Sequence, residues 1–102
     1  MRRLIAVALV VLPLNSALPA SLETGRRAFQ VEDFATALAE FRALATAGNT
    51  EAQYWLGQMY DAGLGLPASP RMAINWLRKA ADGGHAKAQR VVGVYYEIGK
   101  TV

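Results

Sequence analysis

The sequence repeats itself after 36 residues, and this repeat restricts the fold more than any other feature. Small residues fall on small residues and aromatic residues on aromatic residues at that single offset. The matching pairs are Ala37 and Ala73, Leu38 and Ile74, Ala45 and Ala81, Gly48 and Gly84, Ala52 and Ala88, Gln53 and Gln89, Leu56 and Val92, Gly57 and Gly93, Tyr60 and Tyr96, and Gly63 and Gly99. Such a period is typical of chains that stack copies of one supersecondary unit.

Each unit reads as two helices joined by a turn. Thr50 and Gln53 have the spacing of a capping box, which makes Thr50 the expected N-cap of the central unit's first helix. Ser69 followed by Pro70 is the pattern that opens its second helix. No segment shows the strict alternation of a strand, so the fold class is all-α. The expected helices cover about residues 22–29, 32–47, 50–62, 70–82 and 85–98.

Two glycines lie in the middle of expected helices at equivalent positions, Gly57 and Gly93. A glycine there costs about 1 kcal/mol relative to alanine. A glycine that recurs in register indicates a close approach of another helix backbone. We therefore expect both glycines to pack against neighbouring helices, with Ala37 and Ala73 as the small residues on those helices.

The first 20 residues have the layout of a secretory signal peptide. Arg2 and Arg3 precede an unbroken apolar run over residues 4–12, and small residues lead to a cleavage position after Ala20. The sequence therefore predicts a periplasmic or secreted protein of a bacterium, without a stable membrane span after cleavage. An uncleaved inner-membrane anchor is the alternative, because Leu18 fits poorly at the third position before the cut.

Charge and composition exclude several classes of function. Loss of the two N-terminal arginines lowers the formal net charge from +3 to +1, which removes the basis for nucleic-acid binding by bulk charge. The chain has no cysteine and one histidine, His85. A metal site is therefore not expected, and His85 is interpreted as a surface residue at a helix start. A hydrolase is a remote alternative, since the segment after residue 20 contains only Ser21 and Ser69 as serines.

Over about residues 27–99 the chain resembles the Sel-1-like repeat family, relatives of the tetratricopeptide repeats, and the central segment 51–89 carries the resemblance. The positions that fit the family pattern are Ala52, Leu56, Gly57, Tyr60, Gly63, Gly65, Ala73, Trp76, Lys79, Ala80, Ala81 and Gly84. The resemblance implies a right-handed α-solenoid of about two and a half stacked helical hairpins. It also implies a scaffold for other proteins, with no catalytic residue and no cofactor.

The repeat divides the chain into four parts. They are the signal peptide 1–20, a tetratricopeptide-like hairpin 21–49, a complete Sel-1-like repeat 50–84 and a half repeat 85–102. The first hairpin is shorter, because Gly25 and Ala37 are 12 residues apart whereas Gly57 and Ala73 are 16 apart. The leading function is a non-enzymatic interaction scaffold or adaptor. The alternative is a small regulator or assembly factor of an envelope enzyme complex.

One predicted partner site is the concave face of the stack. Residues spaced three or four apart on helix 50–62 lie opposite its apolar stripe, and equivalents occur one repeat later. Together they predict a groove for an extended peptide or a partner helix; an ordinary solvated face remains the alternative. Glu51 and Glu97 share this face, and the residues predicted to bind a partner there are Arg26, Tyr54, Gln58, Asp61, Lys87, Arg90 and Val94.

A second predicted partner site is the last helix, which is apolar on nearly every side. Solenoids normally end in an element with a polar outer face. We expect apolar residues to stay exposed here and to dock to a second copy of the chain or to another protein. A shortened member of a longer repeat family is the alternative explanation. The residues concerned are Val91, Val94, Tyr95 and Ile98.

Overall fold

The computed structural model describes residues 18–101, so the predicted signal peptide lies almost wholly outside the described part of the chain. Within residues 18–101 the chain forms five helices and no strand, which confirms the all-α prediction. The helices are α3 (Leu22–Gln30), α4 (Phe34–Thr46), α5 (Thr50–Ala62), α6 (Pro70–Asp82) and α7 (Ala86–Thr101). None of the described helices is long and apolar enough to cross a membrane.

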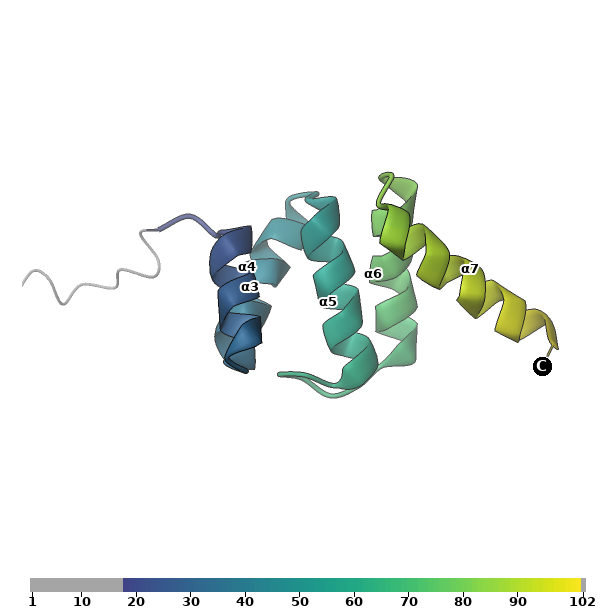
Figure 1. The fold of residues 1–102 in the computed structure, drawn as a ribbon, viewed down its shortest axis with the longest axis horizontal. Coiled ribbons are helices and arrows are strands. Elements are labelled where there is room, and N and C mark those ends of the chain that lie inside the picture. Colours follow the sequence, from purple (N-terminus) through teal and green to yellow (C-terminus); the bar gives the residue numbers. More distant parts are fainter. Residues whose placement is uncertain (1–17, 102) are drawn as a thin grey trace, which may run out of the picture.

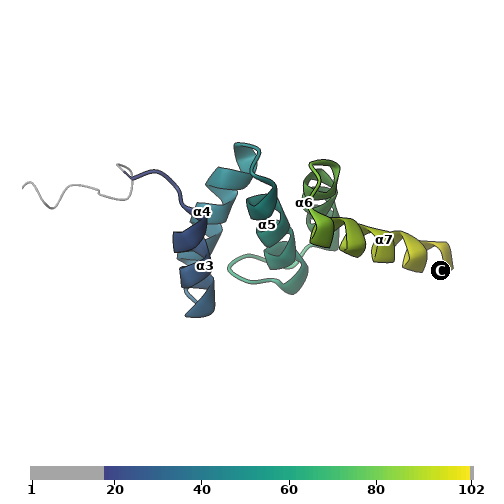
Figure 2. The same ribbon diagram turned by 45° about the horizontal axis from the view of Figure 1, so that its top comes forward.

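Each helix packs against the next one along the chain, so the helices form a solenoid. Helices α3 and α4 make the first hairpin and α5 and α6 the second, and the two hairpins lie side by side (Figure 1). Helix α7 packs by its first half on α6, and its second half then runs away from the rest of the stack. This divergence is visible in both ribbon views (Figures 1 and 2).

The 36-residue offset is reproduced in the hydrogen bonds of the turns that precede α5 and α7. Gly48 and Gly84 take positive φ angles of 103° and 95°. In the first turn the Gln53 side-chain amide donates to the carbonyl oxygen of Ala45 at 3.2 Å. The equivalent bond, from Gln89 to Ala81, measures 3.1 Å. The structural unit is therefore the one that the sequence repeat predicts.

The N-cap of α5 is Asn49, and the prediction of Thr50 was wrong by one residue. The Asn49 Oδ1 atom accepts a hydrogen bond from the backbone N–H of Ala52 at 2.8 Å. Gln53 forms no capping box, because its amide is buried and used for the bond to Ala45. Both Asn and Thr are good N-caps, but the long-range bond from Gln53 leaves the capping role to Asn49. Ser69 and Pro70 open α6 as predicted.

Close helix contacts form at glycines in both complete hairpins. A Cβ atom on Gly57 would lie 2.7 Å from Leu77 Cγ and 3.2 Å from the Ala73 carbonyl oxygen. A Cβ atom on Gly25 would lie 2.7 Å from a ring carbon of Phe41. The shorter first hairpin thus keeps the same kind of contact with a shorter turn between its helices.

The core consists of two clusters joined along the stack. The larger one holds the first hairpin against α5, where the Phe41 and Trp55 rings stack at 5.3 Å and Phe29 meets Trp55 edge-on at 4.9 Å. The smaller one is built around Leu77 and Val92 and holds α7 to α6. Burial of such apolar surface is the main stabilising contribution in a domain of this size.

Candidate functional site

The N-terminus of α7 is held on α5 by a polar cluster around His85. The His85 Nδ1 atom accepts a hydrogen bond from the Ala88 backbone N–H at 3.2 Å, so His85 is the capping residue of this helix. Its other ring nitrogen, Nε2, then carries the proton and donates to Glu51 at 2.8 Å. The His85 side chain is only 12% exposed. The prediction of a helix-start residue is confirmed, but the prediction that it lies on the surface was wrong.

Two further aromatic residues complete this cluster. The Trp55 indole N–H donates to the second oxygen of Glu51 at 3.0 Å, and the Tyr54 ring stacks on the His85 ring at 4.6 Å. Burial opposes ionisation of Glu51, but the hydrogen bonds from His85 and Trp55, together with the positive charge of Arg26, hold its pKa below the ordinary value. The cluster therefore joins two repeats through an ionised carboxylate.

A second joint links the end of α5 to the middle of α7. The Tyr95 hydroxyl donates to Asp61 Oδ1 at 2.7 Å. This hydrogen bond to a carboxylate, together with partial burial, raises the pKa of Tyr95 above its ordinary value. Asp61 and Tyr95 belong to different predicted partner sites, and the structure places them in contact.

The predicted concave groove is therefore not assembled as a free surface. Tyr54 and Asp61 contact the next unit, and Gln58 beside them is half-buried. The physical reason is that the side of α5 with Tyr54, Gln58 and Asp61 faces α7, the first helix of the following repeat. Arg26 is exposed on α3, and its charge acts on Glu51 across the stack.

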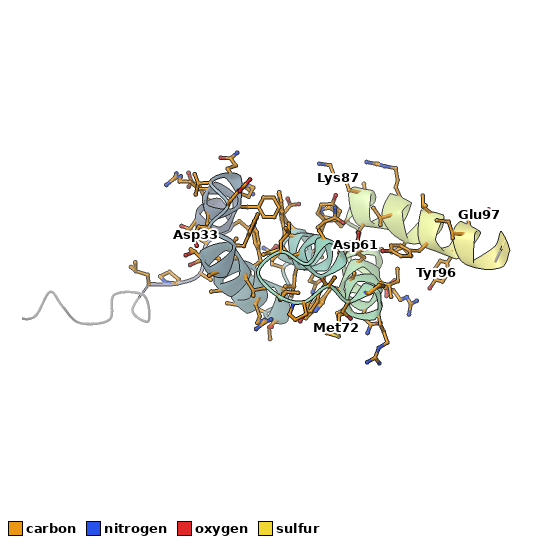
Figure 3. The ribbon with its side chains drawn as sticks, turned by 90° about the horizontal axis from the view of Figure 1, so that it is seen from below. Asp33, Asp61, Met72, Lys87, Tyr96 and Glu97 are labelled. Atoms are coloured by element: carbon orange, nitrogen blue, oxygen red, sulfur yellow. The ribbon has the colours of Figure 1, made fainter. Side chains whose placement is uncertain are left out.

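The equivalent stripe of α7 has no helix packed over it in the described part of the chain. Lys87 and Arg90 are exposed there, and Val94 and Ile98 are each 56% exposed. In Figure 3, Lys87 and Glu97 lie along the edge of α7 that points away from α6. The prediction that apolar residues stay exposed on this helix is confirmed for Val94 and Ile98.

An open groove of about 360 Å³ runs along this part of α7, with an almost wholly apolar lining. Val91 and Tyr95 are half-buried and form its inner wall. The structure thus brings four predicted residues into one apolar surface. We call this surface the α7 groove; its lining residues are Val91, Val94, Tyr95 and Ile98.

Sequence reasoning missed the exposure of Tyr96 and misjudged Gly93. Tyr96, the repeat equivalent of Tyr60, is 52% exposed on the opposite edge of α7, where its ring lies 5.5 Å from the guanidinium of Arg78. No described atom of another helix lies within 4 Å of the Cβ position at Gly93, so the expected close approach of another helix is absent there. Both differences have the same cause: no described helix follows α7 as α6 follows α5.

The residues with potential catalytic chemistry serve structural roles. The Ser21 and Ser69 hydroxyls each accept a backbone N–H bond as N-caps, from Thr24 and Met72 respectively. His85 is used by its own cap and by Glu51. Across residues 18–101 there is no group of three or more potential metal ligands.

The stacked hairpins and their repeated turns define a helical-repeat solenoid. Within that class, residues 50–85 match the family described as the Sel1 repeat, which confirms the predicted resemblance.

The chain is also similar to an exopolysaccharide production negative regulator from Rhizobium leguminosarum bv. viciae. The two are 42% identical over 62 residues, which is 60% of this chain and 23% of the relative. The chain thus spans about a quarter of the length of that curated relative.

Proposed function

We propose that this chain is a non-enzymatic protein-binding module that works as a regulator in the bacterial cell envelope. The observation that carries the proposal is the α7 groove, where Val94 and Ile98 are more than half exposed. The positively charged side chains of Lys87 and Arg90 are also exposed on this helix. Exposed apolar surface rimmed by polar residues marks association sites. The Sel1 repeat supports the same class, since such repeats suggest protein–protein interaction.

The regulated process that we propose is production of a surface polysaccharide. The support is the similarity to a protein named as a negative regulator of exopolysaccharide production. In this proposal the chain binds protein through α7, and the bound form restrains the export or synthesis system. Assembly of an envelope complex is the alternative form of the same binding function.

The location that we propose is the periplasm, which follows from the signal-like pattern of residues 1–20. A fusion of the chain to an enzyme that is active only after export provides the test. Activity that disappears when Arg2, Arg3 and the apolar run are deleted supports export. Full activity without them contradicts it.

The binding function is tested by capture of the tagged chain from its host after crosslinking, with two matched variants. Val94→Glu places a charge in the α7 groove, whereas Val31→Glu makes the same change at a valine that is 71% exposed on the first hairpin. We expect that the Val94→Glu variant no longer captures the protein. We also expect its host to produce more polysaccharide, approaching the output of a strain from which the gene for this chain is deleted. The Val31→Glu variant should capture the protein and restrain polysaccharide output as the unchanged chain does. Equal behaviour of the two variants would contradict the proposal.

A further inference from the structure

We infer that the α7 groove binds the α7 helix of a second copy of this chain, antiparallel and across a two-fold axis. This inference rests on the proposed use of α7 for protein binding and names its partner. The apolar residues Val91, Val94 and Ile98 follow one another at spacings of three and four, which is the spacing of the core positions in paired helices. They line one open groove, so they present a continuous stripe.

Charge on the rim of the groove selects the second copy as the partner. Arg90 and Glu97 are both exposed on α7 and are seven residues apart, so they lie on the same side of the helix. The two residues are separated by about 10.5 Å along the helix axis, which is too far for an ion pair between their side chains. Neither forms an ion pair with any other residue of the described chain.

An antiparallel arrangement satisfies both charges at once. It places Arg90 beside Glu97 of the second copy, and the two-fold axis repeats this ion pair on the other side of the crossing. A parallel arrangement pairs this flanking position with the one on the other side of the apolar stripe, so Arg90 and Glu97 would not meet. The charge pattern is therefore complementary to itself only when the two helices run in opposite directions.

Val91 and Val94 of the apolar stripe fit the same register, in which Ile98 lies opposite Lys87 of the second copy. A two-fold axis near residues 92 and 93 places Val91 against Val94 of the second copy, and the reverse contact follows from symmetry. In heptad terms these are core positions, and Arg90 and Glu97 occupy the flanking position that pairs with itself in antiparallel helices. Figure 3 shows Glu97 on the edge of α7 that points away from α6.

The interface consists of one helix from each copy, so it belongs to the small and weak class of interfaces. We therefore expect a dimer whose population depends on protein concentration. The test is sedimentation equilibrium over a range of concentrations, with the chain purified in the form that its host produces. Three variants are compared with the unchanged chain: Arg90→Glu, Glu97→Arg and the double exchange of both residues.

We expect each single exchange to weaken dimerisation about tenfold or more, because it creates two like-charge contacts. The double exchange restores the dimer, since the ion pairs form again with their signs reversed. Arg42→Glu on the exposed side of α4 serves as the control for net charge and leaves the dimer unchanged. If Arg90 or Glu97 only stabilised the fold of its own chain, the double exchange would not restore dimerisation.

A strict monomer at all concentrations would overturn the inference, as would single exchanges without effect or a double exchange without rescue. The proposed function fails by a different result, which is equal protein capture by Val94→Glu and Val31→Glu. Val94-dependent capture of another protein by a monomeric chain would therefore reject the second copy as partner and leave the binding function standing.

Discussion

Gly57 and Gly93 occupy the same position of two repeats but have different surroundings. At Gly57 the side chain of Leu77 and the backbone of Ala73 fill the space of a Cβ atom, whereas at Gly93 no described atom of another helix does so. A helix-interior glycine is unfavourable in both places. Only at Gly57 does the packing of α6 offset that cost.

We predict that Gly57→Ala and Gly93→Ala change stability in opposite directions. Gly57→Ala should lower the free energy of unfolding by about 1–2 kcal/mol, because the methyl group meets Leu77 in a closely packed interface. Gly93→Ala should raise it by about 0.5–1 kcal/mol through helix propensity alone. Urea denaturation of the two variants gives both values. Destabilisation by Gly93→Ala would show that α7 is covered by another part of the chain.

Glu51 gives the fold a dependence on acid pH. Its pKa is lowered in the folded chain from an ordinary value of 4.5, mainly through hydrogen bonds that outweigh burial. Its stabilising contribution is therefore complete above pH 4.5 and is lost as the pH falls through the lowered folded pKa. Because the Glu51 side chain is 40% exposed, solvent screening keeps this contribution small.

The corresponding prediction concerns Glu51→Gln. Its deficit in unfolding free energy relative to the unchanged chain should be largest at pH 5 and should shrink toward pH 3, because the unchanged chain loses the ionised carboxylate over that range. Thermal unfolding at the two pH values measures this difference. A deficit that stays constant with pH would contradict the role assigned to the Glu51 carboxylate.

At the scale of elements, α7 is packed against the stack along only part of its length. Its first half packs on α6 through Ala88 and Val92, whereas its second half carries the exposed side chains Val94, Tyr96 and Ile98. Helix segments with few buried apolar contacts open at low free-energy cost.

We predict that the backbone amides of residues 94–98 exchange with solvent at least tenfold faster than those of residues 56–60 in α5, at concentrations where the chain is monomeric. Hydrogen exchange followed by mass spectrometry makes this comparison. Raising the concentration should slow exchange in residues 94–98 if α7 pairs with a second copy. Equal protection of the two segments in the monomer would contradict the division of α7 into two halves.

The helices were predictable because their signals are local. Ser69 and Pro70 open α6, and Gly63 closes α5 in the left-handed conformation. The N-cap at Asn49 was missed because Thr50 and Gln53 have the spacing of a capping box, whereas in the structure the Gln53 amide is bonded to Ala45 across the turn. The local sequence pattern alone does not predict the hydrogen bond between Gln53 and Ala45.

The candidate site was predictable only in part, for the same reason. Helical spacing identified the apolar side of α7, which includes Val94 and Ile98. Spacing also put Tyr54 on an outer face, but it cannot show that the following helix covers that face and stacks His85 on the tyrosine ring. Whether a stripe lies free or joins two repeats depends on the position of the next unit in the stack.

At the scale of the whole molecule, the stack has a closed part and an open part. From α3 to α6 each helix is covered on the sides that carry its apolar residues, and aromatic rings join the two hairpins. Helix α7 is anchored by His85 and Tyr95 and then leaves the stack (Figure 2). This arrangement presents one apolar surface on a rigid base, which suits a module that binds protein.

The most direct measurement is photo-crosslinking in the living host from a light-activated amino acid placed at Val94, with Asn75 on the exposed side of α6 as the matched control. The account predicts a protein adduct from position 94, formed with a second copy or with a regulated partner, and none above background from position 75. Absence of any protein adduct at position 94, or equal adducts at both positions, would contradict it.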